Sequence, residues 1–125
     1  MKLILFTHQD SAETGIILKN IIEQKFNETQ IQTLQIFNEF KAKLKQPYNY
    51  NKEIFVLLAD CKNRLKELFS LIDLMEGKRI ILILPDDSDF STSMAHQFFP
   101  RFFTYISDTY ADLCAVLTKM TNTKR

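Results

Sequence analysis

Residues 54–59, Ile-Phe-Val-Leu-Leu-Ala, form an unbroken apolar run with Glu53 before it and Asp60 after it. A strand with one wet face alternates apolar and polar residues, so a continuous run this short indicates a parallel strand covered by helices on both faces. Similar runs at 2–6 and 79–84 flank it, and helix-period segments separate all three. The pattern predicts a parallel α/β sheet with the run at 54–59 in its middle.

The remaining elements follow from periodicity and from capping residues. Apolar residues at helical spacing predict five helices, over residues 10–27, 38–46, 62–76, 88–99 and 108–120. The first has a predicted buried stripe of Ile17, Leu18, Ile21, Ile22 and Phe26. Residues 30–37 and 101–107 predict two more strands. Right-handed crossovers between neighbouring strands then favour a three-layer, doubly wound, five-stranded parallel sheet of order 2-1-3-4-5, a flavodoxin-like fold.

Length and charge limit the classes of function. The 125 residues suit one domain, residues 1–125, with a frayed polar tail at 121–125. A net charge of +1 gives no general attraction to nucleic acid or to an anionic membrane. The sequence also lacks a signal peptide and a membrane-spanning run, so we expect a cytoplasmic protein.

The order and spacing of these elements resemble, over the whole chain, the receiver domain of bacterial two-component response regulators. In that family, two acids follow the first strand, a phosphate-accepting Asp ends the third, Ser or Thr follows the fourth and Lys follows the fifth; together they bind Mg²⁺. The matching positions here are Thr7 and His8, Leu58, Leu84 and Pro85, and Ser107. The resemblance therefore implies a degenerate receiver, or pseudo-receiver: a non-enzymatic signalling module that is not phosphorylated through the usual Asp mechanism.

Polar residues still follow the strands, and the carboxyl ends of parallel strands are where such sheets bind ligands. The expected strand-end pocket comprises Thr7, His8, Asp10, Asp60, Asp86 and Asp87. We expect no cofactor. The alternative is a relocated Mg²⁺ site formed by Asp60, Asp86 and Asp87 with Asp10, in which Asp10 and Asp60 are the candidate ligands. These acids also suit a plainer role as helix caps and loop residues.

Two residues are candidate phosphate acceptors. Asp60 lies two residues beyond the expected acceptor position. His8 follows Thr7 in a Thr-His pair that is similar to the phosphorylated histidine of mannose-family phosphotransferase IIA domains, although Gln9 stands where that family has Gly. A neutral imidazole is a competent nucleophile near neutral pH. The alternative for His8 is a loop histidine with local hydrogen bonds.

A flavin or nucleotide site is a third hypothesis. Residues 11–15, Ser-Ala-Glu-Thr-Gly, are faintly similar to a flavodoxin phosphate loop. However, the chain has only two glycines and no phosphate-binding Gly motif. The hydroxyl spacing also departs from that of flavodoxins.

Aromatic residues gather in the last third of the chain. They are Phe90, Phe98, Phe99, Phe102, Phe103, Tyr105 and Tyr110. A short helix and an outer strand cannot easily bury so many rings, and an exposed apolar patch usually marks a partner surface. Receivers dimerise through their fourth helix, fifth strand and fifth helix, so we expect a protein partner there, or a second copy of the chain. The alternative is that the rings pack against the sheet.

Overall fold

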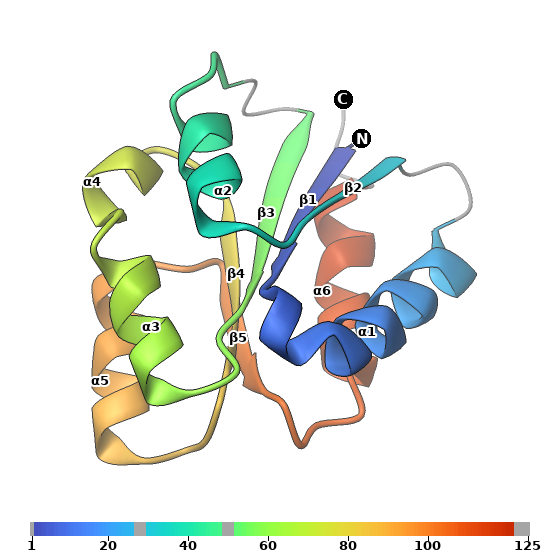
Figure 1. Cartoon of the computed structure of the whole chain (residues 1–125). Helices are drawn as coiled ribbons and strands as arrows, with labels where there is room; N and C mark the ends of the chain where they lie inside the picture. Colours follow the sequence, from blue (N-terminus) through green and yellow to red (C-terminus); the bar gives the residue numbers. More distant parts are fainter. Residues whose placement is uncertain (1, 27–29, 49–51, 122–125) are drawn as a thin grey trace.

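A single parallel sheet organises the chain (Figure 1). The computed structural model describes residues 2–26, 30–48 and 52–121, so most of the expected tail at 121–125 lies outside the described residues. The strands are β1 (Lys2–Thr7), β2 (Gln30–Leu34), β3 (Glu53–Leu58), β4 (Ile80–Leu84) and β5 (Phe102–Tyr105). All neighbours pair in parallel, in the order β2-β1-β3-β4-β5. The predicted topology is confirmed.

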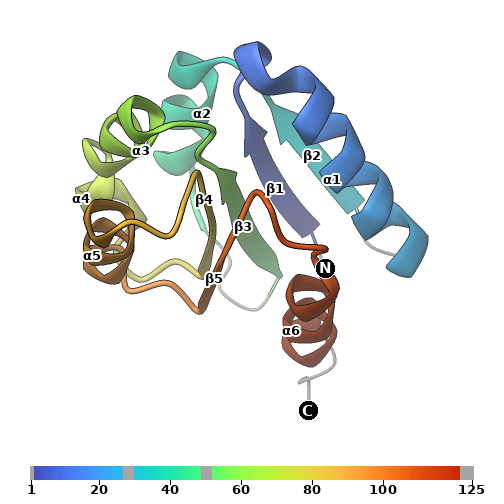
Figure 2. The same cartoon turned by 90° about the horizontal axis from the view of Figure 1, so that it is seen from below.

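Helices cover both faces of the sheet (Figures 1 and 2). The helical elements are η1 (Gln9–Ser11), α1 (Ala12–Lys25), α2 (Phe37–Leu44), α3 (Lys62–Phe69), α4 (Ile72–Met75), α5 (Asp89–Gln97) and α6 (Ala111–Thr121). Helices α1 and α6 lie on one face, and α2, α3, α4 and α5 lie on the other. In the described part of the chain, every helix falls short of the length and apolarity that a bilayer crossing requires.

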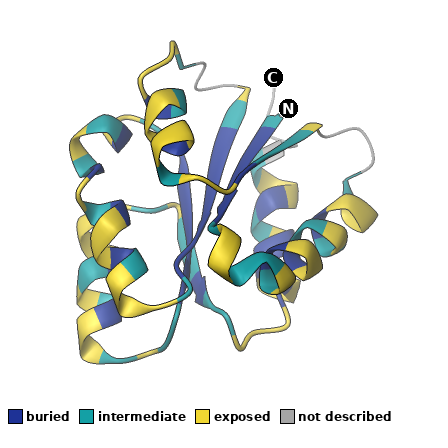
Figure 3. Ribbon diagram, viewed as in Figure 1, coloured by how far each residue is buried: buried dark blue, intermediate teal, exposed yellow. Residues whose placement is uncertain are grey.

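The central strand β3 supplies both halves of the core (Figure 3). Phe55, Leu57 and Ala59 join the cluster beneath α2–α5. Ile54, Val56 and Leu58 join the cluster beneath α1 and α6. Because successive side chains point to opposite faces, both faces can be buried only if every residue of the strand is apolar.

The edge strands are shorter than predicted. β2 stops at Leu34 instead of reaching 37, and Ile36, which follows it, is 47% exposed. β5 spans only Phe102–Tyr105 of the predicted 101–107. An edge strand ends where its hydrogen-bonded pairing with the neighbouring strand ends. The last pairs are Phe6 with Leu34 and Leu84 with Tyr105.

The predicted helix over 62–76 is two helices. The Leu71 amide donates to the Leu68 carbonyl at 3.0 Å. This bond spans three residues, as in a tight turn, instead of the four of an α-helix. The Ser70 hydroxyl donates to the Glu67 carbonyl at 2.5 Å, so α3 ends at this turn. The break turns Leu71 into the core, where it is 5% exposed.

Helix α1 buries a narrower face than predicted. Gly15, Leu18 and Ile22 are its buried residues, whereas Ile17 is 57% exposed. Residues 11–15, the segment compared with a flavin phosphate loop, are the last residue of η1 and the first turn of α1. The segment is thus helical, as the predicted helix over 10–27 requires.

Candidate functional site

The carboxyl ends of β1 and β3 are apolar and covered. Thr7, the last residue of β1, pairs in register with Leu58, the last residue of β3. Their exposed fractions are 1% and 0%. Leu58 stands where the receiver resemblance places the phosphate-accepting Asp, and its side chain packs in the core beneath α1 and α6. Thr7 was expected in a strand-end pocket, but it is buried instead.

A single guanidinium binds the acids nearest to these strand ends. Arg64, on α3, contacts Asp60 through Nε at 3.0 Å and Asp10 through Nη2 at 3.2 Å. Its Nη1 reaches Glu67 at 2.5 Å. The Arg64 side chain is only 11% exposed, whereas that of Asp10 is 69% exposed. Arg64 therefore ties the loop after β1 to the start of α3.

The charge balance of this cluster, Arg64 with Asp10, Asp60 and Glu67, keeps the arginine fully ionised. Partial burial disfavours the charged guanidinium, but hydrogen bonds to Glu67 and Asp60, and the negative charge of both, raise the pKa of Arg64 above its ordinary value overall. Its planar fork of donors suits several carboxylates at once. A cation that is part of the chain thus pairs with one oxygen of each of the three carboxylates.

His8 caps the turn that follows β1. Its Nδ1 accepts from the Asp10 amide at 3.1 Å, and the Ser11 hydroxyl donates to the His8 carbonyl at 3.1 Å. The ring also lies edge-on to Phe6, with centroids 6.5 Å apart. These contacts are those of a loop histidine with local hydrogen bonds, the alternative to a phosphate-accepting histidine.

Asp86 belongs to a second, separate group at the start of α5. Its Oδ1 accepts from the Ser88 hydroxyl at 2.7 Å, the Ser91 hydroxyl at 2.7 Å and the Ser88 amide at 3.1 Å. The hydrogen bonds from Ser88 and Ser91 lower the pKa of the Asp86 carboxyl. Ser88 itself caps α5 by accepting from the Ser91 amide. Asp86 therefore organises a helix start, and its neighbour Asp87 is exposed.

The expected strand-end pocket is thus divided. Arg64 joins Asp10 to Asp60, the Asp10 amide donates to His8, and Asp86 lies apart with two serines. Within residues 2–26, 30–48 and 52–121, no three His, Cys, Asp or Glu side chains are grouped so that they could hold a metal ion. Sequence reasoning missed Arg64, although its spacing of four from Asp60 and three from Glu67 is a readable helix pattern.

The seven aromatic residues differ widely in exposure. Phe98 and Tyr110 are 4% and 5% exposed, so these two belong to the core and not to a surface patch. Tyr110 donates its hydroxyl to the Ile106 carbonyl at 3.1 Å. The half-buried rings are Phe102, Phe103 and Tyr105.

Two phenylalanines are exposed. Phe90, on α5, is 37% exposed and lies 6.0 Å and 5.5 Å from the ammonium groups of Lys62 and Lys66. Phe99, just beyond α5, is 88% exposed. Phe90 and Phe99 are therefore the exposed rings of this set, and Phe102, Phe103 and Tyr105 are partly exposed.

Comparison with known proteins identifies the fold. No protein family model and no curated protein matches the sequence. Solved structures that match at low identity include CpaE2 of Sinorhizobium meliloti 1021, a protein assigned to pilus assembly, and a CheY-like protein, TadZ, of Pseudomonas aeruginosa PAO1. The first is 11% identical with a TM-score of 0.66, over 96% of this chain and 99% of its own. The second is 13% identical with a TM-score of 0.68, over 100% of this chain and 97% of its own. The chain has a CheY-like, receiver-like fold.

Proposed function

We propose that this chain is a receiver-like regulatory module that acts through protein contacts. It is not an enzyme, and it does not accept a phosphoryl group through the usual aspartate mechanism. It works in the cytoplasm, without a bound cofactor and without a nucleic-acid partner.

The contact of Arg64 with Asp10 and Asp60 carries this proposal. Phosphoryl transfer to a receiver needs a divalent cation that neutralises the phosphoryl oxygens next to the acceptor carboxylate. Mg²⁺ requires near-octahedral oxygen ligands and gives up its hydration reluctantly. A guanidinium already pairs with one oxygen of each candidate ligand, Asp10 and Asp60, and Leu58 offers no oxygen at the acceptor position.

The structural neighbours support a role in assembly or regulation. One is described as CheY-like and the other is assigned to pilus assembly. A fold does not by itself determine function. We therefore propose the shared part only: a rigid α/β module that recognises another protein, within a larger assembly or a signalling pathway.

A phosphorylation assay tests the proposal. The chain is incubated with acetyl phosphate and MgCl₂, and its intact mass is measured beside that of a working receiver domain treated in the same way. We expect the working receiver to gain the mass of one phosphoryl group and this chain to gain none. The Arg64→Gln variant, in which Asp10 and Asp60 lose their cation, is also expected to gain none, because Leu58 still stands at the acceptor position.

A mass gain would refute the proposal and favour a phosphoryl-accepting domain. Its loss in Asp60→Asn would identify Asp60 as the acceptor, and its loss in His8→Ala would identify His8. A gain in Arg64→Gln alone would show that the guanidinium, and not the missing Asp, is what prevents phosphorylation.

A further inference from the structure

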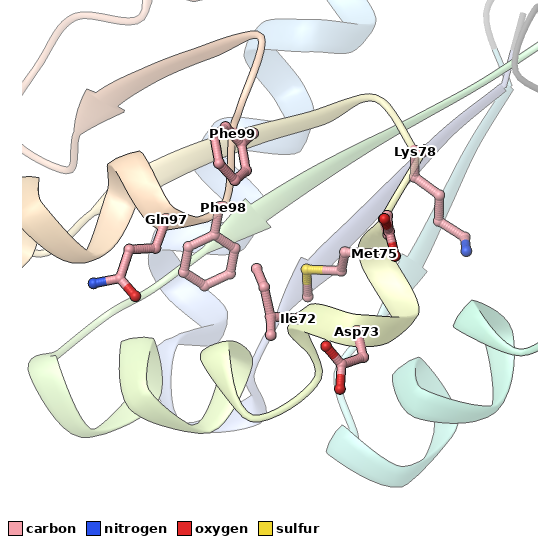
Figure 4. Close-up of a pocket in the computed structure, with 9 residues that line it drawn as sticks. Ile72, Asp73, Met75, Lys78, Gln97, Phe98 and Phe99 are labelled. Carbon is pink, nitrogen blue, oxygen red and sulfur yellow. The ribbon is translucent and has the colours of Figure 1, made fainter.

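A hollow of about 340 Å³ lies between α4 and the segment after α5, at the end of the strands opposite to the Arg64 cluster (Figure 4). Its apolar lining includes Ile72, Met75, Phe98 and Phe99. Figure 4 shows the side chains of Ile72, Met75 and Phe98 turned toward one another, with the Phe99 ring beside them and the Lys78 side chain turned away. An aromatic ring fits easily, since a cavity of about 150 Å³ can hold benzene.

Phe99 projects at the rim of this hollow in an unusual conformation. Its φ is 50°, in the left-handed region that bulky residues rarely adopt. The backbone is held on both sides: the Phe99 amide donates to the His96 carbonyl at 3.2 Å, and the Arg101 amide donates to the Ile80 carbonyl at 2.8 Å. The fold thus keeps a large apolar ring in water at a position that glycine or asparagine would occupy with less strain. Such strain is typical of binding sites.

We propose that this edge is a two-fold contact between two copies of the chain, in which Phe99 of each copy enters the hollow of the other. A two-fold interface must be self-complementary, because the same patch faces itself. This patch carries a projecting ring beside a hollow whose walls include the apolar side chains of Ile72, Met75 and Phe98. The proposal deepens the proposed function, on which it rests, by naming the protein partner and the surface that it contacts.

The charges around the hollow favour a second copy as the occupant. Two exposed acids, Asp73 and Glu76, line the hollow, and Lys78, which also lines it, turns its side chain away and donates to the Leu74 carbonyl at 2.6 Å. Arg101 is exposed two residues after Phe99. When Phe99 enters the hollow of the partner, the segment that carries Arg101 approaches these acids, so opposite charges meet across the contact. On the expected face of α5, β5 and α6, Phe98 and Tyr110 are buried and are not available to a partner.

Sedimentation velocity over a range of concentrations tests this contact, with the unmodified chain, Phe99→Gly and Phe90→Ala compared. We expect the unmodified chain and Phe90→Ala to form dimers. Phe99→Gly should weaken association by about 30-fold or more, as for a central interface residue. Its melting temperature, measured where each chain is monomeric, should equal or exceed that of the unmodified chain, because glycine relieves the positive φ. A residue needed only for folding would instead lower it.

Charge reversal gives a second test. Glu76→Arg and Arg101→Glu should each weaken the dimer, and the two changes together should restore it in part. An unmodified chain that stays monomeric at every concentration, or a Phe99→Gly variant that dimerises as strongly as the unmodified chain, would overturn this inference. Neither result touches the proposed function, which is decided by the mass measurement.

Discussion

Gly15 of α1 lies directly against Thr7 of β1. A Cβ atom at residue 15 would stand 2.6 Å from the Thr7 hydroxyl oxygen and 2.7 Å from the Thr7 Cβ. Both residues are buried. The missing side chain therefore sets how closely the start of α1 approaches the end of β1, which is also the strand end next to the Arg64 cluster.

Gly15→Ala should destabilise the fold. Overpacking of a tight contact costs about 1–3 kcal/mol, which outweighs the gain of roughly 1 kcal/mol that alanine has over glycine inside a helix. The free energy of unfolding from urea titration measures the difference. Asn20→Ala, at an exposed position of the same helix, should change it by less than about 0.5 kcal/mol. A Gly15→Ala chain as stable as the unmodified one would show that the contact is loose.

Neighbouring residues of α1 should respond in opposite ways. Leu18→Ala should cost about 2–5 kcal/mol, because Leu18 is fully buried and its loss leaves a cavity. Ile17→Lys should change the stability by no more than about 0.5 kcal/mol, because Ile17 is 57% exposed. Thermal or urea unfolding of the two variants compares them. A large loss of stability in Ile17→Lys would instead support the wider buried stripe predicted from the sequence.

Phe98 and Phe99 should differ in the same manner. Phe98→Ala removes a ring that is 4% exposed and packs against Phe69, with centroids 5.7 Å apart, so a loss of about 3–5 kcal/mol is expected. Phe99→Ala removes a ring that is 88% exposed and should leave the stability of the monomer within about 0.5 kcal/mol. Unfolding at low protein concentration, where self-association does not contribute, is the appropriate measurement.

Asp86 should make the free energy of unfolding depend on pH in the acidic range. Its folded-state pKa is lowered, so its contribution is complete above the unfolded pKa of about 3.9 and is lost as the pH falls through the folded value. Ser91→Ala removes one of the donors, raises the folded pKa and should reduce the acid-dependent loss. Urea midpoints between about pH 2 and pH 6 measure it, with Ser93→Ala on the exposed side of α5 as the control. Equal acid dependence in Ser91→Ala and the unmodified chain would exclude this role.

Arg64→Lys should weaken the link between the loop after β1 and α3. Lysine provides a point charge in place of a planar fork, so it cannot serve Asp10, Asp60 and Glu67 at once. We expect a loss of about 1 kcal/mol at low salt, and less in about 1 M NaCl, where charge interactions are screened. Unfolding at both salt concentrations tests this, with Asn63→Ala as an exposed control on α3. A loss that does not change with salt would indicate packing of the arginine stem instead.

The sheet could be predicted because its information is local. A six-residue apolar run is enough to mark β3 as buried on both faces, and the alternation of runs and helical segments then leaves few topologies. The break in the helix over 62–76 was not predicted, because the apolar periodicity continues through Ser70 and Leu71. Only the inward turn of Leu71 shows that the two halves follow different directions.

The candidate site was predicted only in part. The absence of the receiver's acids at Thr7 and Leu58 is visible in the sequence. The Arg64 cluster is harder to predict from the sequence, because Asp10 lies 54 residues from Arg64. Phe98 and Phe99 are adjacent and identical, and a positive φ at the second one separates a core ring from an exposed one. No composition or spacing rule carries that information.

The guanidinium of Arg64 is attached to the main chain, and this distinguishes it from any ion that could occupy the same place. A chelator cannot remove it, and a fall in the magnesium concentration cannot leave its position vacant. Under the proposed function, control of this protein would therefore act through its abundance and its binding partners.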